Sequence, residues 1–60
     1  MLLKLKGKRV EKGLTQKKIS ELLHMELATY TRKERGKAQF KLDEIHRILE
    51  ILDCKFEDIF

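Results

Sequence analysis

The sequence has 60 residues, enough for one domain, and 42% of them are apolar while 40% are charged. A chain of this length buries only about 60% of the surface that its unfolded form exposes, which excludes a deep substrate cavity or a dinucleotide-binding fold. Its single cysteine excludes an internal disulfide, and no apolar run approaches the ~18 residues of a membrane span. With no proline, three glycines and mostly helix-forming residues, the composition predicts an all-α fold.

Basic charge is concentrated in the first part of the chain. Residues 1–37 carry eleven Lys or Arg against four Glu, a net charge of +7. Residues 38–60 carry three Lys or Arg against six acidic residues, a net charge of −3. Such a basic region favours an anionic partner, although a solvated lysine-rich surface explains the composition equally well.

The first helix is expected over residues 2–12, with Gly13 as a left-handed end. The apolar residues on its inward side are expected to be Leu2, Leu5 and Val10. Thr15 is a favourable N-cap for a second helix over residues 16–23. The residues expected to face inward from this helix are Ile19, Leu22 and Leu23.

Lysines occupy the first turn of this second helix, where the helix dipole favours acidic residues. Lys17 and Lys18 therefore indicate that an anion approaches this end, as phosphates do at helix N-termini. The alternative is a tolerated surface cost of a few tenths of a kcal/mol.

A third helix is expected over residues 27–35, with Gly36 as its end. Only residues 24–26 separate it from the second helix, which predicts a sharp helix-turn-helix corner. We expect His24 to take the left-handed conformation in this turn and Met25 to plug the corner with its apolar side chain.

The clearest amphipathic helix follows. Its apolar residues with a 3.6-residue period are Leu42, Ile45, Ile48, Leu49 and Leu52. Asp53 can form its left-handed end. Phe40 before this helix and a short helical turn at residues 56–60 are expected to close the core.

Three stretches, EKGLTQKKISELL, TRKERGK and LDEIHRILEILDCKFEDIF, resemble the Cro/cI-type helix-turn-helix repressors of the Xre family. The resemblance extends from about Leu5 to Phe60 and is nearest to small regulators of phages and integrated elements in Gram-positive bacteria. It implies a compact five-helix, lambda-repressor-like domain over residues 1–60, with the helix-turn-helix at about residues 16–35. It also implies a homodimer and a recognition helix in the major groove of double-stranded DNA.

The resemblance and the charge pattern together predict the contacts. Base contacts are expected from Glu26, Leu27, Ala28, Thr31 and Arg32. Phosphate contacts are expected from Thr15, Gln16, Lys17, Lys33, Arg35 and Lys37. Arg9 and Glu34 match an internal ion pair that ties the first helix to the third. Gln16 matches a glutamine that also braces the recognition helix.

The chain departs from the family pattern in the turn and at the start of the recognition helix. His24 replaces the usual turn glycine, and Glu26 replaces the usual Ser or Thr N-cap. The departures at Glu26 and at Leu27, which stands where the family usually has a polar reading residue, support an alternative function, a protein-interaction module on the same fold, such as an antitoxin or an anti-repressor partner. Such a module would bind a regulatory protein and show little or no specific DNA binding.

The apolar end of the chain allows two interpretations. Phe56, Ile59 and Phe60 form either part of the monomer core or a two-fold dimer seam, and both roles can coexist. Cys54 reads as a small apolar filler, and the histidines lack metal-ligand spacing. We therefore expect no enzyme activity, metal or cofactor. A single free thiol and no export signal favour the cytoplasm of a bacterium, with the protein on the nucleoid when bound.

Overall fold

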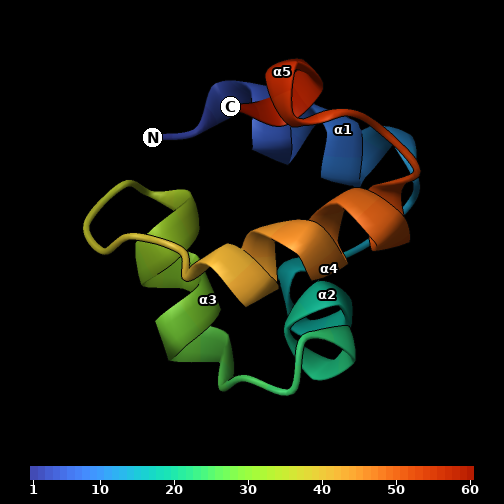
Figure 1. The fold of residues 1–60 in the computed structure, drawn as a ribbon. Helices are drawn as coiled ribbons and strands as arrows, with labels where there is room; N and C mark the ends of the chain where they lie inside the picture. The colour runs from blue at the N-terminus through green and yellow to red at the C-terminus, as the bar shows by residue number, and fades with distance from the viewer.

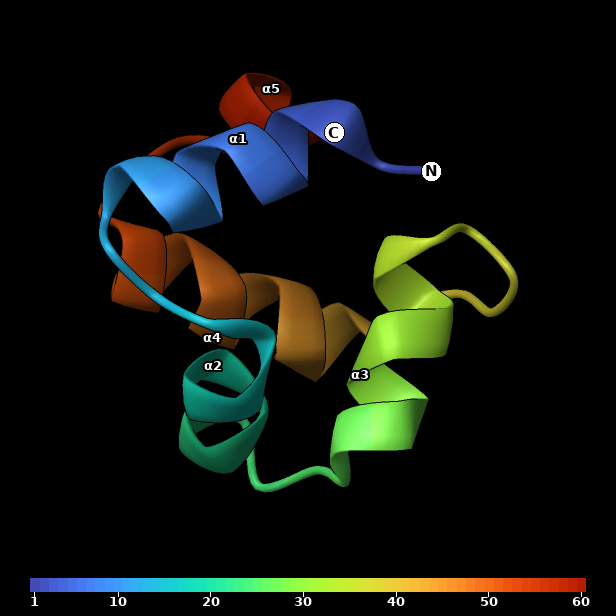
Figure 2. The same ribbon diagram turned by 180° about the vertical axis from the view of Figure 1, so that it is seen from behind.

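The computed structural model describes residues 1–60, which form five helices and no strand. The helices are α1 (Leu3–Glu11), α2 (Gln16–Leu22), α3 (Leu27–Glu34), α4 (Leu42–Leu52) and α5 (Phe56–Ile59). As Figure 1 and Figure 2 show, α2 and α3 lie at one end of the molecule, α1 and α5 lie side by side at the other, and α4 crosses between them. The predicted all-α, five-helix fold is confirmed. None of the helices combines the length and apolar character needed to cross a bilayer.

The first four helices end in the same way, with a left-handed residue that turns the chain aside. These residues are Gly13 (φ 73°), His24 (φ 57°), Gly36 (φ 81°) and Asp53 (φ 50°), as predicted. After α3, the N–H of Gly36 donates to the carbonyl of Lys33 at 3.1 Å, and that of Lys37 donates to the carbonyl of Arg32 at 2.9 Å. This pair of bonds is the Schellman motif, and it satisfies carbonyl groups that the helix leaves without partners.

The core is formed by one apolar cluster to which all five helices contribute. Its buried members are Leu5, Ile19, Leu23, Tyr30, Ile48, Leu52 and Ile59. Met25 and Phe40 pack against this cluster, as the sequence predicted. The rings of Phe40 and Tyr30 lie 5.9 Å apart between centroids, so the loop before α4 is anchored on α3.

Three apolar residues predicted to face inward are exposed instead: Val10, Leu22 and Leu42. Neighbouring residues of a helix point about 100° apart, so the inward position next to Val10 is taken by Arg9, and that next to Leu22 by Leu23. Leu42 is 71% exposed because it is the first residue of α4, before the helix reaches the core.

Candidate nucleic-acid interface

Helix α3 has two chemically different sides. Tyr30, Lys33 and Glu34 form its inward side and are buried. Ala28 and Arg32, which are spaced four residues apart, form its outward side together with Arg35 at the C-cap, and all three are exposed. The outward side is therefore a short surface of small and basic side chains, at the end of the molecule where α2 and α3 lie in Figure 1.

Glu34 is the centre of a buried polar network that joins three helices. It is only 2% exposed, and its carboxylate accepts hydrogen bonds from Arg9 of α1, from Nε at 3.0 Å and from Nη2 at 3.3 Å. It also accepts from Nε2 of Gln16 in α2 at 3.0 Å and from the hydroxyl of Tyr30, one turn earlier on α3. Arg9 further donates to the carbonyl of Leu14 at 2.6 Å. These bonds fix the inward side of α3 against α1 and the start of α2.

The network also controls the protonation of its members. Burial alone raises the pKa of the Glu34 carboxyl, but hydrogen bonds from Arg9, Tyr30 and Gln16 outweigh burial and hold that pKa below its usual value. Burial, followed by the hydrogen bond to Glu34, raises the pKa of Tyr30. At neutral pH the buried network therefore combines a carboxylate, a guanidinium and a neutral phenol.

The residues predicted to contact bases lie at the start and on the outward side of α3. The exposed ones are Glu26, Leu27, Ala28 and Arg32. Leu27 is 45% exposed, and the Glu26 side chain forms no capping hydrogen bond although Glu26 is the N-cap. Thr31 is half-buried at the edge of this surface, whereas Thr29, for which no sequence pattern predicted a contact, is exposed.

At the start of α2, some of the residues predicted to contact phosphates already make hydrogen bonds within the protein and others do not. Thr15 accepts a hydrogen bond from the N–H of Lys18 at 3.0 Å and so caps the helix as predicted. Lys17 is exposed, while Gln16 is half-buried because its amide is bonded to Glu34. An exposed ammonium and the helix N-terminus therefore lie next to the group that braces α3.

At the end of α3, Arg35 and Lys37 are exposed, as phosphate contact requires. The prediction for Lys33 needs correction. Its side chain is turned inward, and its ammonium lies 2.7 Å and 3.0 Å from the two carboxylate oxygens of Glu44 in α4. Because these bonds occupy the ammonium, Lys33 is not free at the surface to meet a phosphate.

The three residues predicted at a dimer seam are divided between core and surface. Ile59 is 1% exposed and belongs to the monomer core, which corrects its assignment to the seam. Phe56 is 51% exposed, and its ring stacks on that of Phe60 with centroids 5.0 Å apart. Phe60 is half-buried and meets Phe40 edge-on at 6.0 Å.

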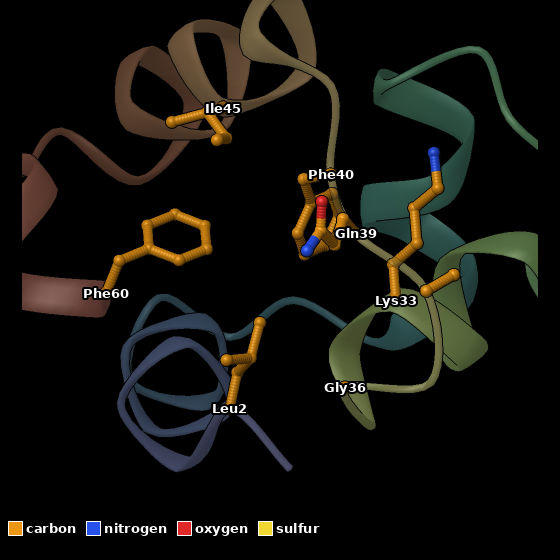
Figure 3. A pocket seen from close by; sticks show the side chains of 8 residues that line it. Leu2, Lys33, Gly36, Gln39, Phe40, Ile45 and Phe60 are labelled. Atoms are coloured by element: carbon orange, nitrogen blue, oxygen red, sulfur yellow. The ribbon is translucent and has the colours of Figure 1, made fainter.

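An apolar groove of about 390 Å³ opens beside Phe60. Leu2, Phe40, Ile45 and Phe60 line it from four separate segments, and Figure 3 shows them around one open space. The stem of Lys33 forms part of one wall. Phe60 thus borders the groove and also contacts the exposed ring of Phe56.

The single thiol lies away from the outward side of α3. Cys54 is half-buried and packs against the core, in line with the prediction of an apolar filler. Burial, followed by the nearby charge of Asp58, raises the pKa of the Cys54 thiol. The group is therefore protonated at neutral pH and a poor nucleophile.

Comparison with protein-family models matches the chain to a helix-turn-helix family over residues 5–59. No curated protein and no solved structure gives a significant match. The matched region contains α2, the short turn and α3, the two helices from which such proteins take their name, and it extends through α5. The chain therefore belongs to the Xre family of Cro/cI-type helix-turn-helix DNA-binding regulators.

Proposed function

We propose that the protein is a transcriptional repressor that binds an inverted-repeat operator in double-stranded DNA as a homodimer. The observation that carries this proposal is the division of α3 into an exposed basic side and an inward side fixed by Glu34. A helix with its side chains is about 10–12 Å wide, and the major groove is about 12 Å wide. A rigidly held α3 can therefore enter the groove with its outward side toward the base edges.

Sequence is read from the outward side and the start of α3. Arg32 is suited to a bidentate contact with guanine, and Leu27 and Ala28 to contact with the thymine methyl group. Glu26 can accept from the amino group of cytosine, since its carboxylate makes no capping bond. Thr31, at the edge of this surface, is a peripheral contact. Each good contact contributes about 1–3 kcal/mol of discrimination.

Phosphates are held at two places, the start of α2 and the end of α3. Thr15, Gln16 and Lys17 offer the N-terminus of α2, while Arg35 and Lys37 offer positive charge after α3. Such contacts set the position of the protein on DNA and most of its affinity, without reading sequence. No cofactor is needed for either kind of contact.

The apolar surface around Phe60 supports the homodimer. The ring of Phe56 is exposed and stacks on Phe60, and Phe60 also lines the apolar groove. A second copy that covers this surface would remove these groups from water. A dimer of this family places its two recognition helices about 34 Å apart, one turn of DNA, and so reads a palindrome.

Two observations favour a second candidate, a protein-interaction module that binds a regulatory partner. The exposed carboxylate of Glu26 would face phosphates if α3 entered DNA, and Leu27 beside it is apolar and exposed. In either function we place the protein in the cytoplasm of a bacterium, encoded by the host or a phage, and on the nucleoid when it is bound to DNA.

The experiment that separates the two functions is selection of bound duplexes from random DNA by the purified protein at near-physiological salt. Enrichment of a short inverted repeat is expected, and it would support specific binding and a symmetric dimer together. Binding without enrichment, lost as salt rises, would contradict the repressor and direct the search to a protein partner.

A further inference from the structure

The ion pair between Lys33 and Glu44 joins the last turn of α3 to the first turn of α4. Lys33 Nζ lies 2.7 Å from Oε1 and 3.0 Å from Oε2 of Glu44, and both side chains are largely buried. Oε1 of Glu44 also accepts a hydrogen bond from the backbone N–H of Lys41 at 2.8 Å. The Lys41 ammonium has no acceptor to return this bond, so Glu44 alone caps α4. One carboxylate thus holds the end of the recognition helix and the start of the next helix.

The segment between these two helices, residues 36–41, is held by contacts at both of its ends. Its first turn is fixed by the Schellman bonds of Gly36 and Lys37 to the end of α3. Near its other end, Phe40 packs against Tyr30, and the Lys33 ammonium lies 6.0 Å from the centroid of the Phe40 ring. In Figure 1 the segment projects from one side of the molecule after α3 and then returns to the start of α4.

Lys37 is exposed in this projecting segment. Its backbone position depends on where α3 ends and where the segment is drawn back to α4. Through its bond to the N–H of Lys41, Glu44 determines where the segment returns to α4. Glu44 is also bonded to Lys33, one turn before Lys37. A residue that contacts no DNA itself is therefore placed to position one that does.

We propose that Glu44 is a positioning residue for DNA binding. Through Lys33 and the N–H of Lys41 it holds residues 36–41 so that Lys37 meets a phosphate, and it keeps the Lys33 ammonium away from the DNA. The inference rests on the proposed function, in which Lys37 is a phosphate contact.

The test compares Glu44→Gln, Lys33→Gln and the control Asp43→Asn by their affinity for the selected operator and by the salt dependence of that affinity. Asp43 is exposed in the same turn of α4 and its side chain makes no hydrogen bond or ion pair, so its variant reports the general electrostatic effect of one removed negative charge. Gln at position 44 still offers an oxygen to the N–H of Lys41, so the variant removes chiefly the ionic bond to Lys33.

We expect Glu44→Gln and Lys33→Gln to weaken binding in the same direction, each by roughly tenfold, the size of one lost charge-assisted contact. The two substitutions change the net charge with opposite signs, so bulk electrostatics predicts opposite effects. The effect of Glu44→Gln should vanish when Lys37→Gln is already present, because both act through one contact. If Glu44→Gln instead raises affinity as Asp43→Asn does, or if its effect adds to that of Lys37→Gln, the positioning role is wrong.

A readout without DNA separates this inference from the proposed function. Backbone amide exchange in residues 36–41 should accelerate in Glu44→Gln and in Lys33→Gln but not in Asp43→Asn. The exchange is measured without denaturant, at a pH at which all three variants are folded. Unchanged exchange would overturn the positioning role even if the operator is bound. Accelerated exchange in a protein that selects no operator would support the effect of Glu44 on residues 36–41 and would contradict the proposed repressor function. Should Glu44→Gln lower the unfolding midpoint too far, Lys33→Gln tests the same expectation from the other partner.

Discussion

The amide Nε2 of Gln16 lies 3.0 Å from Oε1 of Glu34, so the first residue of α2 is bonded to the last residue of α3. The same carboxylate accepts from Arg9 of α1. The start of α2, where phosphates are proposed to bind, is thereby linked to the helix proposed to read bases. Any movement of one relative to the other must break a bond to a buried charge, which makes the arrangement stiff.

The buried pair of Arg9 and Glu34 should be essential to the fold. Arg9→Ala strands the carboxylate, which is expected to lower the free energy of unfolding by about 3–5 kcal/mol. A domain of this size rarely has more than about 3–5 kcal/mol in total, so the variant should be largely unfolded at 25 °C. Urea unfolding followed by circular dichroism measures this.

The control for this variant is Lys8→Ala, at the preceding residue of the same helix, which removes an ion pair to the exposed Glu11. Its urea midpoint should stay close to that of the wild type, since exposed pairs contribute little. A midpoint for Arg9→Ala equal to that of Lys8→Ala would contradict the structural importance of the buried pair.

Stability should decline in acid because of Glu34 and Glu44. Burial raises each pKa, but hydrogen bonds from Arg9 and Lys33 respectively, with further donors, hold both below the ordinary value of 4.5. The unfolded state therefore binds more protons in this range, so the stabilisation is complete above about pH 4.5 and is lost as pH falls through the lower folded values. Urea midpoints measured between pH 7 and pH 2 should show this fall.

Glu34→Gln identifies the carboxylate behind the acid dependence. The variant is less stable at neutral pH, but it has one shifted carboxyl fewer, so its midpoint should change less with pH. Glu11→Gln, which removes a carboxylate from an exposed position, is the control. Equal pH dependence in Glu34→Gln and the wild type would show that Glu34 does not contribute.

Most of the fold follows from local sequence signals. Caps and left-handed residues such as Thr15 and Gly36 have strong conformational preferences, so the limits of the helices could be predicted. The direction in which Val10 and Leu42 point could not, because a short helix with few apolar residues fits more than one inward side. Arg9 faces inward because it forms a buried ion pair, and it therefore occupies the inward position that an apolar pattern assigns to its neighbour Val10.

The candidate site could be predicted only in part, because some of its contacts join residues that lie far apart in the sequence. The resemblance predicted the pair of Arg9 and Glu34, but not the hydrogen bond from Tyr30 to Glu34. The spacing of four residues between them could have indicated this bond, because it places two side chains side by side on a helix. Lys33 was predicted to contact phosphates because its position matches the place in the family where phosphates run past the end of the recognition helix. Its partner Glu44 is eleven residues away on another helix, and no local pattern connects the two.

Arg32 and Lys37 should separate sequence reading from general affinity. Arg32→Ala is expected to relax the preference at one base pair by about 1–3 kcal/mol, because it removes a contact to a base edge. Lys37→Ala should weaken binding to every sequence alike and flatten the slope of log K against log salt by about one. Titrations of the operator and of a scrambled duplex at several salt concentrations measure both effects. Unchanged affinity and preference in Arg32→Ala would remove Arg32 from the reading surface.

The last prediction separates the dimer seam from the core at the end of the chain. Phe56→Ala removes an exposed ring, so it should leave the urea midpoint of the monomer nearly unchanged while weakening self-association and operator binding. Ile59→Ala should do the reverse, lowering the free energy of unfolding by about 2–5 kcal/mol, because Ile59 is buried in the core. Sedimentation velocity over a range of concentrations measures association, with Leu3→Ala, another exposed apolar residue, as the control. If Phe56→Ala and Leu3→Ala associate equally well, the homodimer uses a different surface from the one around Phe60.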